Sequence, residues 1–216
     1  MSLSGTRRAV RPVLAAAALA LVSGLSLAAS PARPNLLLVT VDTLRPDRLG
    51  CYGSPYLKTP AIDRLAGSGV VFGRAFAHTP LTLPSHASIL LGTTPLYHGV
   101  HDNGNFKGPE GLPNLATFLK GQGYATGAFI GAFPLDARFG LDRGFDAYDE
   151  SYGSGTGLDF QFVERKAEAV VAAALAWLDG RSGPWFVWVH VFDPHQPYER
   201  PAPYSARFND DAYSGE

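Results

Sequence analysis

Three uninterrupted apolar runs stand out in the pattern of hydrophobic and polar positions along the chain. They cover residues 35–43 (NLLLVTVDT), 124–132 (YATGAFIGA) and 185–192 (WFVWVHVF). Runs that lack polar alternation and are bounded by turn residues are typical of strands buried on both faces of a parallel sheet. The pattern therefore predicts three central strands.

Helical periodicity lies between these runs. A short predicted helix places Ile62 and Leu65 inward, and a later one carries Leu115, Phe118 and Leu119 on a single side. Strands that alternate with helices predict an α/β fold, a mainly parallel sheet flanked by helices. The predicted helices cover residues 59–69, 86–91, 112–121 and 160–178.

The segments between these elements are rich in glycine and proline. Residues 70–72 and 75–77 fit short extended pieces, whereas residues 134–157 and 196–216 are predicted to be long loops. Sheets of this class usually have about five or six strands. With three strong strands and a final loop, the chain is expected to be a truncated, first part of a larger domain.

The N-terminal segment has the composition of an export signal. Arg7, Arg8 and Arg11 precede an apolar run over residues 13–29 that ends in small side chains. This order predicts a signal peptide over residues 1–29, followed by a catalytic-type domain over residues 30–216. The protein is then periplasmic or extracellular; a retained membrane anchor or a soluble helix are the alternatives, and contact with a membrane is expected only if the segment stays uncleaved.

Composition excludes several classes of function. The 216 residues carry a formal net charge of −1 and only 17% charged side chains, which does not fit an electrostatic nucleic-acid binder. Cys51 is the single cysteine, so a disulfide within the chain and a cysteine-based zinc cluster are both ruled out.

Candidate chemistry lies where the predicted strands end. Asp42 ends the first strand, Thr82 precedes a predicted helix start, and His195 follows the third strand. A carboxylate, a hydroxyl at a helix N-terminus and an imidazole suit metal-assisted ester hydrolysis. Each residue also has a purely structural interpretation: Asp42 in a turn, Thr82 as a helix cap in competition with Ser85, and His195 as an anchor for a loop.

Four segments, in order and spacing, resemble successive blocks of the sulfatase family in the alkaline phosphatase superfamily. They cover most of residues 33–200 and include the opening block RPNLLLVTVDTLRPDRLGCYG and the later segment FDPHQPY. The resemblance implies an alkaline phosphatase/sulfatase-like fold and a metal-dependent hydrolase or transferase. The segments are residues 33–53, 59–72, 83–92 and 192–198.

Details within these blocks depart from the sulfatase pattern. Sulfatases carry a Cys or Ser, oxidised to formylglycine, in Cys/Ser-x-Pro-x-Arg; here the matching residues are Thr82-Leu-Pro-Ser-His86. The paired aspartates of the first strand are replaced by Asp42-Thr43, and the Gly-Lys-Trp-His segment by residues 131–134 (GAFP). A threonine nucleophile resembles that of phosphoethanolamine transferases and nucleotide pyrophosphatases, which favours phosphorus over sulfur as the target.

Carried over by position, the resemblance implies that Asp42 is a metal ligand and Thr82 the nucleophile and second metal contact. It implies that His195 binds substrate or serves the leaving group, and that His86 takes the place of the substrate-binding arginine. The resemblance also implies a divalent metal ion, and the sequence does not distinguish between zinc, calcium and manganese. The other ligands of this metal are expected on a later strand. The substrate is a small-molecule, glycan or lipid ester. The alternative is a truncated, non-catalytic fragment or a binding protein of the same fold.

Overall fold

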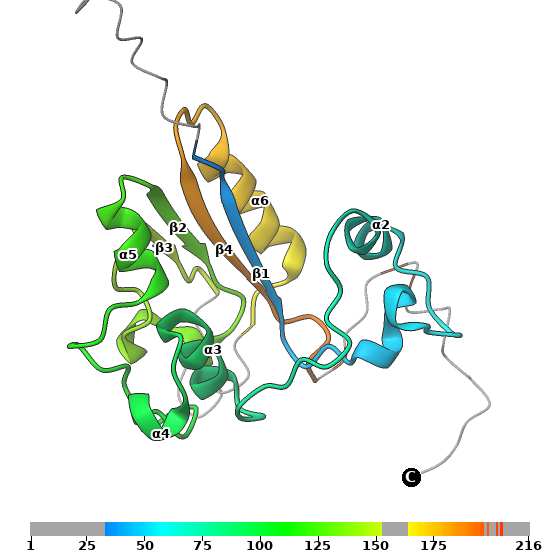
Figure 1. The fold of residues 1–216 in the computed structure, drawn as a ribbon, viewed down its shortest axis with the longest axis horizontal. Helices are drawn as coiled ribbons and strands as arrows, with labels where there is room; N and C mark the ends of the chain where they lie inside the picture. The colour runs from blue at the N-terminus through cyan, green and yellow to red at the C-terminus, as the bar shows by residue number, and fades with distance from the viewer. Residues whose placement is uncertain (1–32, 153–163, 197, 199–201, 203, 205–216) are drawn as a thin grey trace, which may run out of the picture. The chain divides into compact units, whose positions relative to one another are not determined.

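The computed structural model describes residues 33–152, 164–196, 198, 202 and 204. Within this part the chain forms a four-stranded, all-parallel sheet in the order β1-β4-β2-β3 (Figure 1). The three strands predicted from the apolar runs are confirmed, each slightly shorter than its run, and a fourth is added. The strands are β1 (Leu36–Val41), β2 (Ala125–Phe129), β3 (Ala147–Asp149) and β4 (Trp185–Val191).

Strand β1 differs from its prediction as a strand buried on both faces. It is an edge of the described sheet, and its side chains alternate between half-buried and exposed. Leu36 and Leu38 pack against the main core, whereas Leu37 and Val39 are 59% and 51% exposed. An edge strand has only one neighbour, so a continuous apolar run does not by itself bury both faces.

Strand β3 lies inside the segment that we predicted to be one long loop. It pairs with β2 in register from Gly127 with Ala147 to Phe129 with Asp149. Asp146 tightens this junction, because its carboxylate accepts hydrogen bonds from the backbone and hydroxyl of Thr126. Hydrogen bonds between Asp146 and Thr126, rather than an apolar run, therefore fix the start of this strand. The extended pieces expected at residues 70–72 and 75–77 form no strand.

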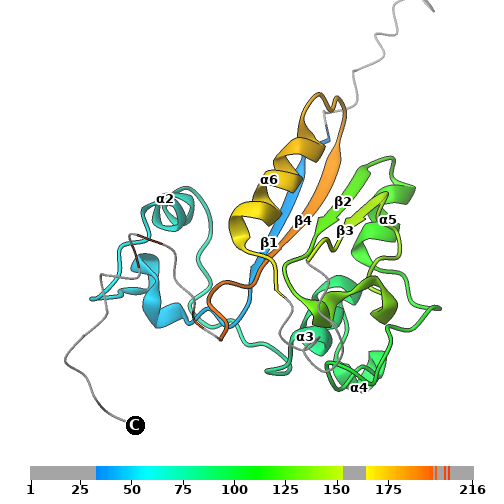
Figure 2. The ribbon, with the colours of Figure 1, turned by 180° about the vertical axis from the view of Figure 1, so that it is seen from behind.

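Helices cover both faces of the sheet. On one face α6 (Ala167–Leu178) packs against β2 and β4 through Val170 and Ala174. On the other face α3 (Thr82–Leu91) and α5 (Leu115–Gly121) enclose the larger core, in which Phe186 and Trp188 are almost completely buried. Figures 1 and 2 show α6 and the pair α3 and α5 on opposite sides of the sheet.

The predicted inward face is partly right in α5 and wrong in α2. In α5 Leu119 is buried as predicted, together with Ala116, whereas Leu115 and Phe118 are 36% and 61% exposed. In α2 (Pro60–Ser68) no residue is buried, and Leu65 is 72% exposed. A small residue such as Ala116 carries little weight in a hydrophobic pattern, yet it allows a helix to approach a sheet closely.

The remaining described elements are short. Helix α4 (Pro95–His98) follows α3, and single 3₁₀ turns lie at Pro46–Arg48, Gly50–Tyr52, Phe133–Leu135 and Ala137–Phe139. Helix α6 begins at residue 167 rather than 160; residues 160–163, the predicted signal segment 1–29 and most of the predicted loop 196–216 lie outside the described residues.

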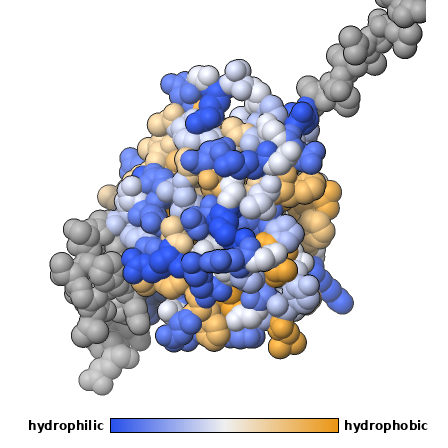
Figure 3. Space-filling model, turned by 90° about the vertical axis from the view of Figure 1, so that its left-hand side faces the viewer, coloured by the Kyte–Doolittle hydropathy of each residue, from blue (hydrophilic) through white to orange (hydrophobic). Residues whose placement is uncertain are grey.

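The face of the molecule on the side of α5 shows mainly polar side chains with smaller apolar patches (Figure 3). None of the helices in the described part of the chain has the length and apolar character needed to cross a bilayer.

Candidate functional site

The end of β1 presents Asp42 at the carboxyl edge of the sheet. Its backbone N–H donates to the carbonyl of Val191, 2.9 Å away, which continues the ladder with β4 by one residue. Thr43 then adopts a φ of +52°, a left-handed conformation that is unfavourable for a β-branched residue. This sharp turn ends the strand and leaves the Asp42 side chain at the sheet edge, where ligands of open α/β folds gather.

Thr82 is the first residue of α3, which therefore begins four residues earlier than predicted and ends before Gly92 as expected. The Thr82 hydroxyl donates a hydrogen bond of 3.1 Å to Oδ2 of Asp42. The structure thus brings together two side chains that lie 40 positions apart and that the sequence singled out separately.

His190 also contacts Asp42, and the sequence analysis did not single it out. Its Nε2 lies 3.4 Å from Oδ2 of Asp42, and its Nδ1 lies 3.4 Å from the backbone nitrogen of Gly131. Because the Gly131 N–H must donate to Nδ1, the proton of the neutral ring sits on Nε2 and points at Asp42. A completely buried histidine therefore holds the carboxylate.

The pKa of Asp42 reflects these neighbours. Burial alone acts to raise it, but the hydrogen bond and charge of His190, the charge of His86 and the hydrogen bond from Thr82 lower it further than burial raises it. Asp42 consequently stays ionised at neutral pH, as a metal ligand or a proton acceptor must.

His86 lies one helical turn after Thr82 and is 6% exposed. Its Nδ1 lies 2.7 Å from the carbonyl oxygen of Thr82, so Nδ1 carries the proton and Nε2 is a free acceptor with no hydrogen-bond partner. Burial, reinforced by the charge of nearby His190, lowers the pKa of His86 to about 4. In this state Nε2 is a buried acceptor without a hydrogen-bond partner.

Asp42, Thr82 and His86 line one open cavity of about 520 Å³. Its wall is formed by the turn after β1 and by the loop and first turns of α3, including Asp42, Thr82, Ser85 and His86. The start of α3 is fixed from outside the helix, because the Leu83 N–H donates to Oδ1 of Asn103 at 2.9 Å. Asn103 is a second residue that sequence reasoning missed, since it lies in a turn-rich segment with no apolar pattern.

His195 is not brought into this group. Its ring stacks on Phe192 with centroids 4.2 Å apart, and its Nδ1 pairs with the carbonyl of Gln196. No described hydrogen bond or ring contact joins it to Asp42 or Thr82, so its role stays a prediction. The described residues also include no group of three or more His, Cys, Asp or Glu side chains arranged to hold a metal ion.

Comparison with known proteins shows the family to which this chain belongs. The model of the sulfatase family matches residues 34–216, which include every side chain described above. The chain belongs to the sulfatase family. The resemblance predicted from the sequence blocks is confirmed, and so is the α/β fold of a sheet flanked by helices.

The relatives are considerably longer than this chain. Mouse (Mus musculus) steryl-sulfatase is 39% identical over 142 residues, which is 58% of this chain and 23% of the relative. Pig (Sus scrofa) N-acetylgalactosamine-6-sulfatase is 34% identical over 144 residues, or 61% of this chain and 27% of the relative. The chain thus spans about a quarter of the length of these curated relatives.

Solved structures agree with this fold. A phosphonate monoester hydrolase of Agrobacterium radiobacter superposes with a TM-score of 0.68 at 26% identity, covering 82% of this chain and 44% of its own. An alkaline phosphatase superfamily protein from Vibrio parahaemolyticus shares the fold, with a TM-score of 0.62 at 22% identity over 85% of this chain and 45% of its own.

Proposed function

We propose that this chain forms the nucleophile-bearing part of an exported, metal-dependent hydrolase or transferase that acts on sulfate or phosphate esters through Thr82. The observation that supports the proposal best is the hydrogen bond from the Thr82 hydroxyl to Oδ2 of Asp42. It directs the hydroxyl proton at an ionised carboxylate at the N-terminus of a helix, where an anionic ester is favoured.

The reaction follows from this placement. Thr82 Oγ forms a bond to phosphorus or sulfur, its proton passes toward Asp42, and the bond to the ester oxygen breaks. Asp42 releases this proton, and the ester oxygen takes up one proton in exchange and leaves as an alcohol. Water, or an acceptor alcohol in a transferase, then cleaves the Thr82 ester and restores the hydroxyl. The names of the relatives cover both elements: two act on sulfate esters, and the Agrobacterium enzyme acts on phosphonate monoesters.

Asp42 and the Thr82 hydroxyl fit part of a metal site. Both are hard oxygen donors, they lie within hydrogen-bond distance of each other, and they share one cavity. A divalent cation such as zinc, calcium or manganese supplies charge neutralisation for the ester and a lower pKa for the hydroxyl. His190 orients the Asp42 carboxylate from behind, as a second layer of ligands does in metal sites.

The two remaining histidines are assigned to the substrate. His86 lines the cavity, and its buried Nε2 donates to an ester oxygen only after the ring turns toward the cavity and takes up a proton, which a bound dianion favours. His195 lies in the loop after β4 and is proposed to reach the leaving oxygen once substrate is bound. The substrate is a small-molecule, glycan or lipid ester, and export rests on the N-terminal signal pattern.

The test replaces the nucleophile in the complete gene product. We expect Thr82→Ala to lower turnover of 4-nitrophenyl phosphate or sulfate at least about 10³-fold, whereas Thr82→Ser retains part of it. Ser85→Ala is the matched control, because it removes the neighbouring hydroxyl of the same cavity. Turnover that survives Thr82→Ala and is lost in Ser85→Ala contradicts the assignment. Ester binding without any turnover favours the binding-protein alternative.

A further inference from the structure

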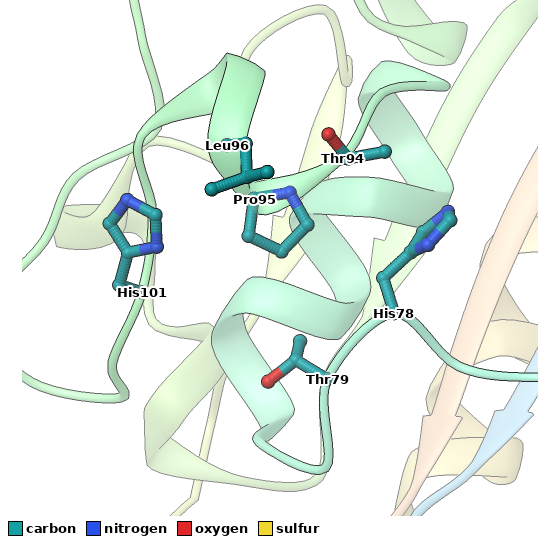
Figure 4. A pocket seen from close by; sticks show the side chains of 6 residues that line it. All are labelled: His78, Thr79, Thr94, Pro95, Leu96 and His101. Atoms are coloured by element: carbon teal, nitrogen blue, oxygen red, sulfur yellow. The ribbon is translucent and has the colours of Figure 1, made fainter.

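A second cavity, of about 450 Å³, lies beside the candidate site and takes no part in the proposed reaction. It is lined by His78, Thr79, Thr94, Pro95, Leu96 and His101, and we call it the histidine pocket. Figure 4 shows the two imidazoles on opposite sides of Pro95 and Leu96, with the two threonines completing the wall. The two histidines come from different loops, one before α3 and one after α4.

The polar side chains of this pocket are free to bind a ligand. No described hydrogen bond engages the side chains of His78, Thr79, Thr94 or His101, and Thr94 does not cap the helix that follows it. The His101 ring is nevertheless held in place, because it packs edge-on against Phe106 with centroids 5.5 Å apart. The pocket thus combines an oriented imidazole with unused hydroxyl groups.

The electrostatics of the pocket favour an anion over a cation. Its lining contains two imidazoles and two hydroxyls but no carboxylate or thiolate. The nearest acid in sequence, Asp102, directs its Oδ1 at the N–H of Asn103 at 2.7 Å. Buried His98 lies near enough for the charges of His101 and His78 to add to the effect of burial in lowering its pKa. The residues that line the pocket therefore include donors for an anion and no negatively charged side chain.

The histidine pocket adjoins the candidate nucleophile. Thr79 lines both cavities, and it precedes Thr82 by three positions in one continuous loop. Three residues of extended chain span about 11 Å at most, so the backbone of Thr79, which lines both cavities, lies within about 11 Å of the backbone of Thr82.

We propose that the histidine pocket binds a second anionic group of the ester substrate while the scissile group lies at Thr82. The substrate class is then an ester with a further sulfate, phosphate or carboxylate about one ring away from the reacting group. This inference rests on the proposed function, because it takes Thr82 as the place of the scissile group.

Binding of three matched ligands tests the proposal. Phenyl phosphate, 4-carboxyphenyl phosphate and the uncharged 4-carbamoylphenyl phosphate are titrated calorimetrically at pH 6, where an imidazole in water is largely charged. We expect the carboxylate ligand to bind about tenfold more tightly than the carbamoyl ligand. The double variant His78→Gln/His101→Gln loses this preference and keeps its affinity for phenyl phosphate. Arg64→Gln, an exposed change outside both cavities, keeps the preference.

Other outcomes overturn the inference. The proposal is wrong if the carboxylate brings no advantage, or if the double variant retains it. If inorganic phosphate shifts the NMR signals of the two rings while the ester ligands show no preference, the pocket is a site for free anions. The two claims can fail separately. If His78→Gln/His101→Gln loses the preference for the carboxylate ligand while Thr82→Ala keeps full turnover, the anion pocket is supported and the proposed nucleophile is contradicted.

Discussion

His190 donates toward Asp42 across 148 positions of sequence, with its Nε2 3.4 Å from Oδ2 of the carboxylate. The contact joins the ends of two neighbouring strands, β1 and β4, which pair in register from Leu36 with Phe186 to Val41 with Val191. The same oxygen of Asp42 accepts from Thr82. One buried imidazole and one hydroxyl therefore fix the carboxylate on which the proposed function depends.

Removal of His190 should loosen this carboxylate. We expect His190→Leu to weaken Mn²⁺ binding about 10- to 100-fold, the usual effect of losing a group that orients a metal ligand. Isothermal titration with Mn²⁺ measures the affinity, and urea unfolding reports the accompanying loss of stability. Phe186→Leu is the control, since it changes a buried side chain of the same strand without touching Asp42. Equal Mn²⁺ affinities in wild type and His190→Leu would contradict the positioning role.

Gly144 should tolerate no side chain. It has a φ of +89°, and a Cβ atom there would lie 2.4 Å from the backbone nitrogen of Thr117 at the start of α5. We expect Gly144→Ala to reduce the free energy of unfolding by more than about 3 kcal/mol. Gly180→Ala is the matched comparison: its φ is +68° but its surroundings are open, so a loss of about 1–2 kcal/mol is expected. Urea denaturation measures the free energy of unfolding of both variants. Equal losses would show that the close approach to Thr117 adds no strain.

His98 should make stability depend on pH. Its Nδ1 accepts from the Val100 N–H at 3.1 Å, so the ring proton is on Nε2, 3.0 Å from the Ser88 hydroxyl oxygen, and a second proton has no place. Burial, followed by the charges of His101 and His78, lowers the pKa of His98 in the folded protein. The unfolded chain therefore takes up the proton first. The contribution of neutral His98 to the free energy of unfolding is therefore present above about pH 6.5 and is lost as the pH falls below that value.

Unfolding free energies between pH 8 and pH 5 test this dependence. We expect His98→Leu to be less stable than wild type at pH 8, with the difference narrowing toward pH 5 because only the wild type loses the contribution of a neutral His98. A difference that stays constant or widens as the pH falls would reverse the sign of the shift.

The free side of β1 should promote self-association. Leu37 and Val39 are exposed on an edge strand whose other edge is unpaired within the described sheet. We expect Leu37→Lys/Val39→Thr to raise the concentration at which the chain begins to aggregate, as measured by light scattering, because charge on an edge opposes strand addition. Val171→Lys, on the exposed side of α6, is the comparison. If both variants change aggregation equally, net charge and not the strand edge is responsible.

Much of the fold was predictable because apolar runs report burial directly. Strands β1, β2 and β4 follow from such runs, and α6 from its apolar helical pattern. Strand β3 was missed because three residues, Ala147–Asp149, carry no readable period and are placed by pairing with β2. The error at Phe118 in α5 has a related cause: the core position is taken by Ala116, whose small side chain contributes little to a hydrophobic pattern.

The candidate site was predictable only where a residue ends an element. Asp42 and Thr82 stood at such ends and are joined in the structure. His190 was hidden, because it occupies a strand of otherwise apolar residues and a histidine there is ordinarily a satisfied core side chain. Asn103 was hidden in a turn. Both act through contacts between distant segments, which one sequence does not record.

Trp188 places an optical probe beside the site. Its buried indole donates to the Thr40 hydroxyl at 3.0 Å, and its ring centroid lies 5.6 Å from that of His86 and 6.5 Å from that of His190. Charging either imidazole, or binding a cation at Asp42, changes the electric field at the indole and hence its emission. With Trp177 and Trp185 replaced by phenylalanine, tryptophan fluorescence reads occupancy of the site without a label or a substrate.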